Sequence, residues 1–294
     1  MRLSINTGPL AGKFGVFRAI EIFSNAGFDC VDITFPSACV KNSQADYVKV
    51  AEQVRDYAEE NGVEINQTHA YCPTSDEDPE KTAKIFERLI KDIHASSIMG
   101  AEVVIVHPNQ HLRYADEGVP EALKKMNYEF YKKLIPYAEK YNIKIAVENM
   151  FQGYDGRCHD STCSRPEEFN EYVDMQSSEY VIACVDIGHC GLVGGQTAGD
   201  VLRTMGDRVK SLHVHDNDNR FDFHLTPFSP VLGKIDWDDV CKALAEIDYS
   251  GDFTFETNGA FENVNEDTVQ SLCCHIHDVG RYLIEKIEKY KYEE

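Results

Sequence analysis

One stretch of the chain carries an unusual density of side chains that bind cations. In residues 211–237, SLHVHDNDNRFDFHLTPFSPVLGKIDW, three histidines and several aspartates follow one short apolar segment. Because side chains alternate across a β-strand, His213 and His215 are expected to leave this segment on the same face. Asp222 and His224 come shortly afterwards. Imidazole and carboxylate groups are typical metal ligands, so the stretch predicts part of a cation site.

The elements that would position such a site follow a regular alternation. Short apolar segments indicate eight strands, each followed by a segment of helical periodicity. The strands are expected at 2–6, 30–35, 64–70, 102–106, 144–147, 181–185, 209–214 and 252–255, and the helices at 14–26, 46–60, 80–99, 120–141, from a capping box at 164–167, and at 197–205, 237–247 and 266–291. This pattern predicts a single (β/α)8 TIM-barrel domain over residues 1–294.

Loop lengths indicate which face of this barrel carries the site. The links from helix to strand are short, whereas the links from strand to helix at 108–119, 149–164 and 215–236 are long and polar. Barrels of this kind work at the carboxyl ends of their strands, where the strand-to-helix loops gather. The active site is therefore expected on that face.

Metal-ligand residues recur at these predicted strand ends. They are His69, His107, Glu148, Asp186, His189, His213, Asp222, His224 and Glu256. Each one alone could simply be hydrogen-bonded or cap a helix. Glu148 and Glu256, however, end apolar strands, where an unpaired carboxylate is costly. We predict a metal site at Glu148, Asp186, His213 and Glu256, leave direct ligation open for the other five, and expect no special role for His215.

Five motifs in this order resemble a known superfamily. AVENM, CVDIGHC, LHVHDND, DFHLTPFSPVLGKIDW and FTFETNG are similar to the xylose-isomerase-like superfamily of sugar phosphate isomerases and epimerases, which includes endonuclease IV-type enzymes. The resemblance covers residues 69–256. After Glu148, the segment NMFQGYDG departs from the endonuclease pattern, and Tyr154 stands near the place where ketose 3-epimerases have a second glutamate.

The resemblance also implies roles for individual residues. Residues matching Glu148, Asp186, His213 and Glu256 bind one divalent metal in the sugar epimerases, where the two glutamates also move protons and His189 lies beside the substrate. In the endonuclease branch further positions bind zinc. The positions that match them here are His69, His107, His189, Asp222 and His224, which allows a cluster of two or three zinc ions.

The predicted chemistry is proton transfer next to a carbonyl group. A divalent cation stabilises the enediolate, and two carboxylates act as base and acid. Glu148 and Glu256 are expected to face each other across the barrel mouth, with His189, His107 and Arg220 binding substrate hydroxyl or phosphate groups. Three carboxylates and one histidine favour Mn²⁺, with Mg²⁺ and Co²⁺ as alternatives, whereas ligation by the additional histidines would favour Zn²⁺.

We therefore expect an isomerase or epimerase that acts on a sugar, sugar phosphate or inosose. Two other functions remain open: a multinuclear-zinc phosphodiester hydrolase like endonuclease IV, and a non-catalytic barrel that binds metal and sugar. With 50 acidic against 29 basic residues, the net charge of −21 argues against a nucleic-acid partner. A small sugar or polyol is the expected partner.

Composition sets the remaining expectations. The longest apolar runs are far shorter than the roughly 20 residues that span a membrane, and the N-terminal sequence has no secretory pattern, so we expect a cytoplasmic protein whose ten cysteines stay reduced. The last helix carries apolar positions at Val279, Leu283 and Ile287. This helix could pack on its own barrel or on another chain, and a homo-oligomer remains open.

Overall fold

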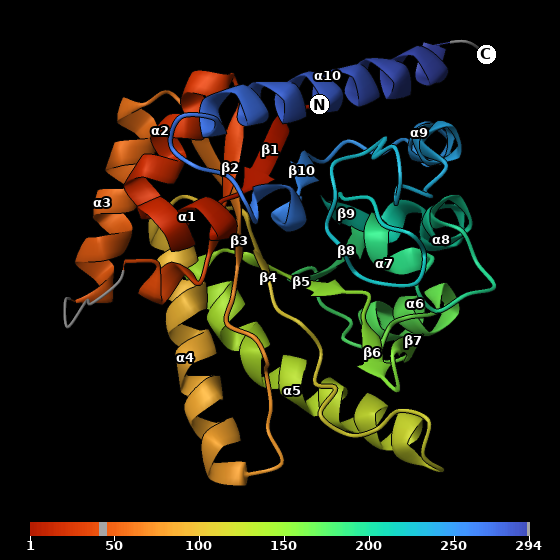
Figure 1. Ribbon diagram of the computed structural model, residues 1–294. Coiled ribbons are helices and arrows are strands. Elements are labelled where there is room, and N and C mark those ends of the chain that lie inside the picture. The colour runs from red at the N-terminus through yellow and green to blue at the C-terminus, as the bar shows by residue number, and fades with distance from the viewer. Residues whose placement is uncertain (41–45, 293–294) are drawn as a thin grey trace.

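A barrel of parallel strands forms the centre of the molecule (Figure 1). The computed structural model describes residues 1–40 and 46–292, and within them eight strands pair in parallel in the order β10-β1-β2-β3-β4-β5-β8-β9. These strands are β1 (Leu3–Asn6), β2 (Cys30–Thr34), β3 (Glu64–His69), β4 (Val103–Ile105), β5 (Lys144–Glu148), β8 (Val181–Asp186), β9 (Val209–His213) and β10 (Phe253–Phe255). Val214, just after β9, bridges Phe255 in parallel, which brings the two edges together.

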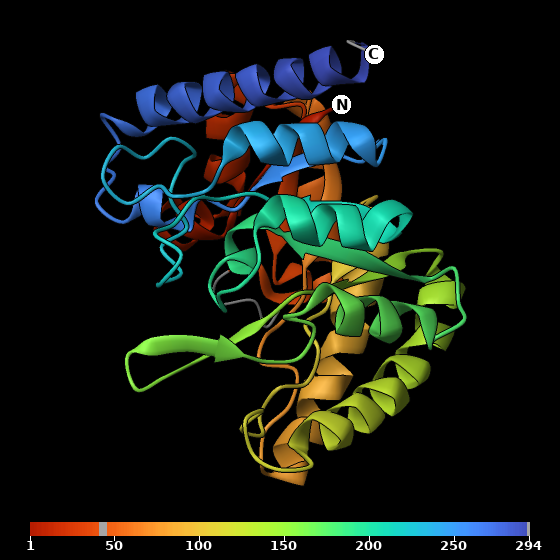
Figure 2. The ribbon, with the colours of Figure 1, turned by 90° about the vertical axis from the view of Figure 1, so that its right-hand side faces the viewer.

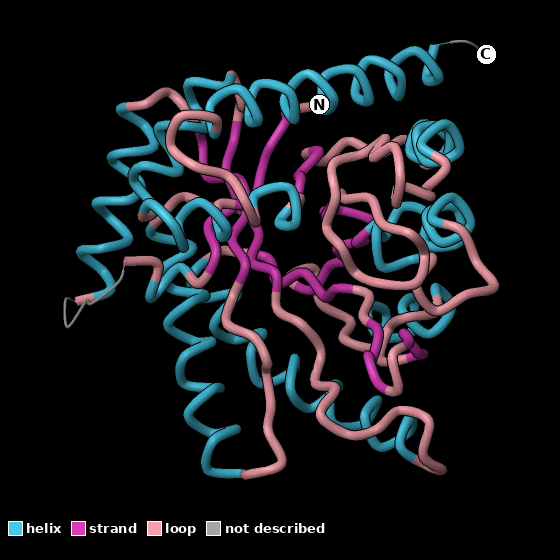
Figure 3. The backbone as a smooth tube through the Cα atoms, viewed as in Figure 1, coloured by secondary structure: helices cyan, strands magenta, loops and turns pink. Residues whose placement is uncertain are grey.

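Helices surround the strands on the outside (Figure 3). They are α1 (Gly8–Phe14), α2 (Val16–Ala26), α3 (Tyr47–Glu60), α4 (Pro79–Ile98), α5 (Val119–Tyr141), α6 (Pro166–Asp174), α7 (Ile187–Cys190), α8 (Ala198–Met205), α9 (Trp237–Glu246) and α10 (Val269–Tyr292), with short 3₁₀ turns η1 (Pro36–Ala38), η2 (Gly206–Arg208) and η3 (Asn258–Phe261). The predicted (β/α)8 TIM barrel is confirmed. None of the described helices is both long and apolar enough to cross a membrane.

The strands alternate their side chains between two buried regions. Val147 of β5 packs in the large apolar layer between strands and helices, whereas Ala146 points into the barrel with Ile105 and Cys184. This period of two is what a strand buried on both faces requires. Polar residues also fill the interior: the Ser211 hydroxyl donates to Gln67 Oε1 over 2.7 Å. The inward positions near the strand ends are therefore available for chemistry.

The helix α10 packs on its own barrel. It contacts α2 and α9, and its side chains Leu283 and Ile287 are fully buried there. This packing is one of the two alternatives expected for the last helix. The ten cysteines all lie in the described part of the chain, and no two of them are bonded to each other there.

The predicted capping box at 164–167 is wrong. Helix α6 begins at Pro166, and Arg165 occupies the N-cap position without a side-chain hydrogen bond. The Ser164 hydroxyl instead donates to Asp160 Oδ1 over 3.2 Å and accepts from the Ser161 amide. Proline favours the first helical position and keeps the residue before it out of the helical conformation, so the helix starts at Pro166 and Ser164 lies one residue before the N-cap, where its hydroxyl stabilises the preceding turn.

The segment expected as a loop after β5 contains a β-hairpin. Strands β6 (Phe151–Tyr154) and β7 (Arg157–Asp160) pair in an antiparallel manner and project from the barrel (Figure 2). Asp155 and Gly156 form the two-residue turn, with φ angles of 50° and 75°. Asp-Gly is a favoured sequence for such a turn because both positions need positive φ.

The helix expected at 14–26 also starts later than predicted. Gly15, with φ of 88°, separates α1 from α2, and α2 therefore begins at Val16.

Candidate metal centre and active site

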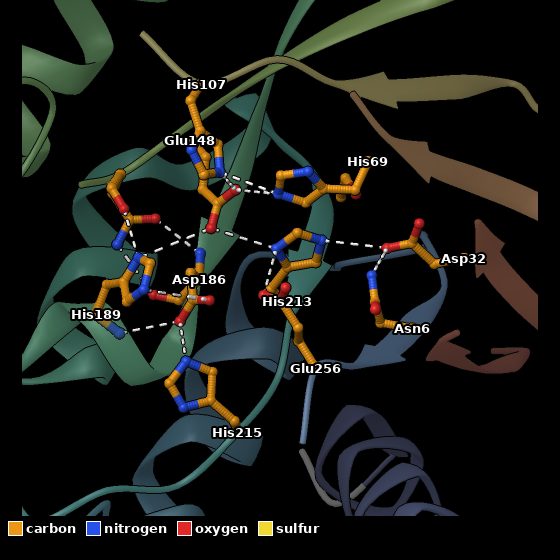
Figure 4. A network of polar contacts seen from close by, with 12 residues as sticks. Asn6, Asp32, His69, His107, Glu148, Asp186, His189, His213, His215 and Glu256 are labelled. Carbon is orange, nitrogen blue, oxygen red and sulfur yellow. Dashed lines mark hydrogen bonds and ion pairs between the residues drawn. The ribbon is translucent and has the colours of Figure 1, made fainter. Parts of the chain in front are cut away.

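The four predicted metal ligands meet at the carboxyl ends of the strands (Figure 4). Glu148 ends β5, Asp186 ends β8, His213 ends β9 and Glu256 follows β10, and one ligand atom from each lies within 4.8 Å of the others. His213 Nδ1 is 3.3 Å from Glu148 Oε1 and 3.2 Å from Glu256 Oε2. The strands β8 and β9 separate the two glutamates, so their carboxylates flank His213 instead of facing each other across the whole mouth.

Asp32 lies beside His213 of this group, although it was not predicted from the sequence. Its carboxylate is fully buried on β2, and Oδ2 lies 3.5 Å from His213 Nε2. The side-chain amides of Asn6 and Gln67 donate to the same oxygen over 3.1 and 3.2 Å. A carboxylate beside Nε2 favours a proton there and leaves the Nδ1 lone pair directed at the glutamates. The sequence signal that could have revealed Asp32 is an aspartate in the middle of the otherwise largely apolar strand Cys30–Thr34.

A second group of ligand atoms shares Glu148. His69 Nε2 and His107 Nε2 lie 3.0 Å apart, and His107 Nε2 is 3.0 Å from Glu148 Oε2. The three side chains together satisfy the geometry of a candidate cation site. His69 ends β3 and His107 follows β4, as predicted.

A third group lies on the other side of Asp186. His189 Nε2 is 3.6 Å from Asp222 Oδ2, and His224 Nε2 is 2.8 Å from the same oxygen. His224 holds a left-handed backbone conformation, with φ of 48°. With His69 and His107 in the second group, the structure brings together all five of the residues whose ligation the sequence left open.

Three of these histidines are oriented in the same way. In each, Nδ1 faces a backbone carbonyl, and Nε2 is turned to the carboxylates. The pairs are His69 with Ala70 (2.9 Å), His189 with Asn149 (2.8 Å) and His224 with Glu256 (2.7 Å). A carbonyl can only accept, so Nδ1 carries the hydrogen, and Nε2 is the nitrogen whose lone pair would be available to a cation when the ring is neutral. Metal-binding histidines are commonly held by such a hydrogen bond.

His215 also lies among these candidate ligands, although no special role was expected for it. It is fully buried, its Nε2 lies 3.0 Å from Asp186 Oδ1, and its ring stacks on His224 with centroids 4.0 Å apart. The chain stays extended through the bridge at Val214, and His215 therefore faces the same side as His213. A Cβ atom at Gly188 would lie 1.9 Å from the His215 ring, so only glycine fits there.

The charges of the site are strongly coupled. Burial alone would raise the pKa of Glu148 and of Glu256, but the neighbouring histidines, His213 above all, hold both pKa values well below their usual range. Burial likewise opposes protonation of His224, yet Asp222 raises the pKa of His224 to about 9. The pKa of each carboxyl falls and that of the imidazole rises because each group stabilises the charged form of the other.

The donor set fits a divalent cation. Glu148 Oε2, Asp186 Oδ2 and Asp222 Oδ1 are buried, and among residues 1–40 and 46–292 their only close polar neighbours are imidazole nitrogens, at 3.0, 3.8 and 3.5 Å. Buried carboxylate oxygens without donors are costly unless they are paired with a cation. Because several such oxygens converge with imidazole nitrogens, these residues suit a metal ion better than a second set of protons.

A cavity of about 600 Å³ opens onto these residues, and we call it the metal cavity. Its lining includes Glu148, His189 and Glu256 of the predicted site. Arg220, predicted to bind substrate, is not brought to this site: it is exposed, and its guanidinium lies 5.9 Å from the centre of the Phe221 ring.

Comparisons with known proteins agree with this architecture. A family model described as "Xylose isomerase-like TIM barrel" matches residues 20–272. An uncharacterized protein of Methanocaldococcus jannaschii is 30% identical over 207 residues, which cover 68% of this chain and 67% of that protein.

Two solved structures share the fold. The crystal structure of a D-tagatose 3-epimerase-like protein is similar over 98% of this chain and 99% of its own, with 22% identity and a TM-score of 0.73. That of an L-ribulose 3-epimerase is similar over 98% and 96%, with 15% identity and a TM-score of 0.76.

Proposed function

The chain belongs to the xylose isomerase-like TIM barrel family, and we propose that it is a divalent-metal-dependent sugar isomerase or epimerase. The observation that carries this proposal is the pair of buried carboxylates, Glu148 and Glu256, on either side of His213 Nδ1. Such a pair provides the two proton-transfer groups that the reaction needs, beside donors for a cation. The fold shared with sugar 3-epimerases supports a sugar as the substrate.

The cation would be held by Glu148, Asp186, His213 and Glu256. Three carboxylates and one imidazole suit Mn²⁺ best, with Mg²⁺ and Co²⁺ as alternatives. A divalent cation bound there supplies a Lewis acid for a sugar carbonyl and its neighbouring hydroxyl.

The protein's own groups perform the proton transfers. The lowered pKa values keep Glu148 and Glu256 ionised at neutral pH, so either can remove the proton from the carbon next to the carbonyl. After protonation, the same carboxyl or its partner returns a proton to the neighbouring atom or to the other face of the carbon. His189 and His107 line the metal cavity and are available for substrate hydroxyls.

One residue favours a substrate other than the simple ketoses. Tyr154, near the position of the second glutamate of ketose 3-epimerases, lies in the hairpin with its ring stacked on His159 at 3.7 Å. It therefore offers a phenol in place of a carboxylate. We propose a sugar or polyol substrate that makes a different contact there, and a cytoplasmic location, which the free thiols support.

The second candidate function is a phosphodiester hydrolase with several zinc ions. It is favoured by the two additional groups of ligands, one at His69 and His107 and one at His189, Asp222 and His224. Several metals close together can activate water for attack on a phosphodiester. The net charge of −21 argues against a nucleic acid as the substrate. The third alternative, a non-catalytic barrel that only binds metal and sugar, would have no need for both glutamates.

One experiment separates these functions. The metal-loaded protein is incubated in D₂O with ketoses, inososes and their phosphates, and proton NMR follows exchange at the carbon next to the carbonyl. We expect deuterium to enter at least one of these compounds. Absence of exchange together with cleavage of abasic DNA would refute the isomerase proposal, and metal analysis giving one ion or three per chain would separate the mononuclear site from the cluster.

A further inference from the structure

A second cavity of about 690 Å³ lies beside the metal cavity. We propose that it is a subsite for a ring-sized substituent on the substrate, so that the protein acts on a sugar carrying a second sugar ring rather than on a free monosaccharide. This inference rests on the proposed function and specifies its substrate class.

The two cavities are neighbours with a common wall. His107, Gln110 and Phe151 line both of them. Complete binding sites for small molecules usually measure about 300–1,000 Å³, and the metal cavity, at about 600 Å³, already falls within that range. A second space of similar volume next to the reacting groups therefore leaves room for a second group of comparable size.

The walls of the second cavity are fixed by hydrogen bonds. The Gln152 side-chain amide donates to the carbonyls of Gln110 and Leu112 over 2.8 and 2.7 Å, and its oxygen accepts from the Tyr114 amide over 2.9 Å. These bonds join the β6–β7 hairpin to the loop after β4. A binding site that is already formed loses less entropy when a ligand binds.

The lining has the chemistry of a site for a neutral polar ring. Apolar and aromatic surface comes from Leu112, Phe151 and Tyr154, and polar groups come from Gln110 and from the pair His111 Nδ1 and Ser75 Oγ, which lie 2.6 Å apart. A sugar ring presents C–H groups to aromatic surface and hydroxyls to such polar groups.

Charge distinguishes the two cavities. The lining of the metal cavity includes the carboxylates of Glu148, Asp222 and Glu256. Among the described residues that line the second cavity there is no carboxylate, although the chain has 50 acidic residues. Its lining does include the cation Arg113, whose guanidinium lies 4.8 Å from the centre of the Tyr154 ring and 3.8 Å from Asp116 Oδ1. The second cavity is therefore unsuited to a further metal ion, and its one guanidinium already has an aromatic and an acidic neighbour.

The test compares D-fructose with lactulose and isomaltulose, two disaccharides that keep the ketose end. Deuterium exchange from D₂O is measured with the metal-loaded, full-length protein. Gly153→Trp is designed to fill the cavity: Gly153 lines it, and a Cβ atom there meets no atom within 4 Å. Leu112→Trp is a second blocking variant, and Arg157→Trp adds the same ring at an exposed position of the same hairpin, outside both linings.

We expect kcat/KM for exchange to be higher for at least one disaccharide than for D-fructose by about tenfold or more. A blocking variant should lower the value for that disaccharide about tenfold more than the value for D-fructose, while Arg157→Trp leaves both unchanged. Equal values for all three sugars, or loss for the disaccharide in neither blocking variant, would overturn the subsite and leave the proposed function intact.

Absence of exchange with every sugar would instead contradict the proposed function. Calorimetry with lactulose and the metal-loaded protein then tests the subsite separately. Binding that is weaker in Gly153→Trp than in Arg157→Trp supports it, and equal binding in both variants, or no binding to the wild type, overturns it.

Discussion

Replacing Asp32 with asparagine should weaken divalent-metal binding while leaving every ligand in place. Asp32 Oδ2 lies 3.5 Å from His213 Nε2, on the side of the ring opposite the two glutamates. Asparagine keeps the size of the side chain and an acceptor for the Asn6 amide. It removes the negative charge that polarises the imidazole and fixes its proton on Nε2.

The size of the effect follows from this distance. Two unit charges 3.5 Å apart interact by about 5 kcal/mol at an effective dielectric constant of about 20. If the metal ion places roughly a third of a unit charge on the His213 ring, the variant loses about 1.5 kcal/mol of metal-binding free energy, which is about tenfold in Kd. This value lies at the lower end of the about 10–100-fold losses typical when the partner of a metal-binding histidine is removed.

The assay is competition for Mn²⁺ with a fluorescent chelator. Asp92→Asn is the matched control: Asp92 is also fully buried, but it sits on α4 and accepts from the amides of Ser37 and Tyr71, each over 3.0 Å. We expect the control to lower stability and to leave the Kd for Mn²⁺ unchanged. An unchanged Kd in Asp32→Asn, or an equal loss in Asp92→Asn, would refute the role given to Asp32.

Four further predictions follow from the same contacts. Glu256→Gln should reduce deuterium exchange by about 10²–10⁴-fold without changing the circular dichroism spectrum, and an unchanged rate would exclude it as a proton-transfer group. A chelator should lower the Tm, and Mn²⁺ should restore it, because bound metal stabilises the folded state; a Tm indifferent to both would argue against a metal site. Gly188→Ala should lower both the stability of the protein and its affinity for Mn²⁺, since its Cβ would lie 1.9 Å from the His215 ring. Calorimetric unfolding and a metal titration measure these two quantities, and wild-type values for both would contradict the prediction. At Asp29, burial raises the pKa, but the hydrogen bonds from Arg281 and from the Leu3 amide, together with the charge of Arg281, outweigh burial and lower the pKa below 3.8; Asp29→Asn should therefore be destabilising at pH 7 by a margin that shrinks as the pH falls below about 4, and urea unfolding that gives a constant margin would contradict this.

The barrel was predictable because its strands and helices have clear periods and its loops differ in length on the two faces. The hairpin β6–β7 was overlooked, although Asp155-Gly156 is a recognised turn sequence. Its strands have four residues each and lie outside the barrel, so they lack the apolar run that marked the other strands. The capping box at 164–167 matched a pattern, but Pro166 and the preceding turn decide how Ser164 is used.

The clustering of the candidate ligands was predictable because the carboxyl ends of parallel strands gather at one face. Asp32 was missed because it lies inside a strand and not at the end of one. Its neighbours Val31 and Ile33 belong to the outer apolar layer. His215 was given no special role although the alternation placed it on the same face as His213, and the bridges at Val214 and Asp216 agree with that alternation. The second cavity depends on how two loops and a hairpin pack together, which local sequence patterns do not specify.

The central claim is proton transfer by Glu148 and Glu256 beside a bound divalent metal. The most direct test is proton NMR of a sugar incubated in D₂O with the Mn²⁺-loaded protein, with the chelated protein and with Glu148→Gln. The account predicts deuterium at the carbon next to the carbonyl with the loaded wild type and almost none in the other two samples. Exchange that persists at the wild-type rate after chelation or in Glu148→Gln would contradict it.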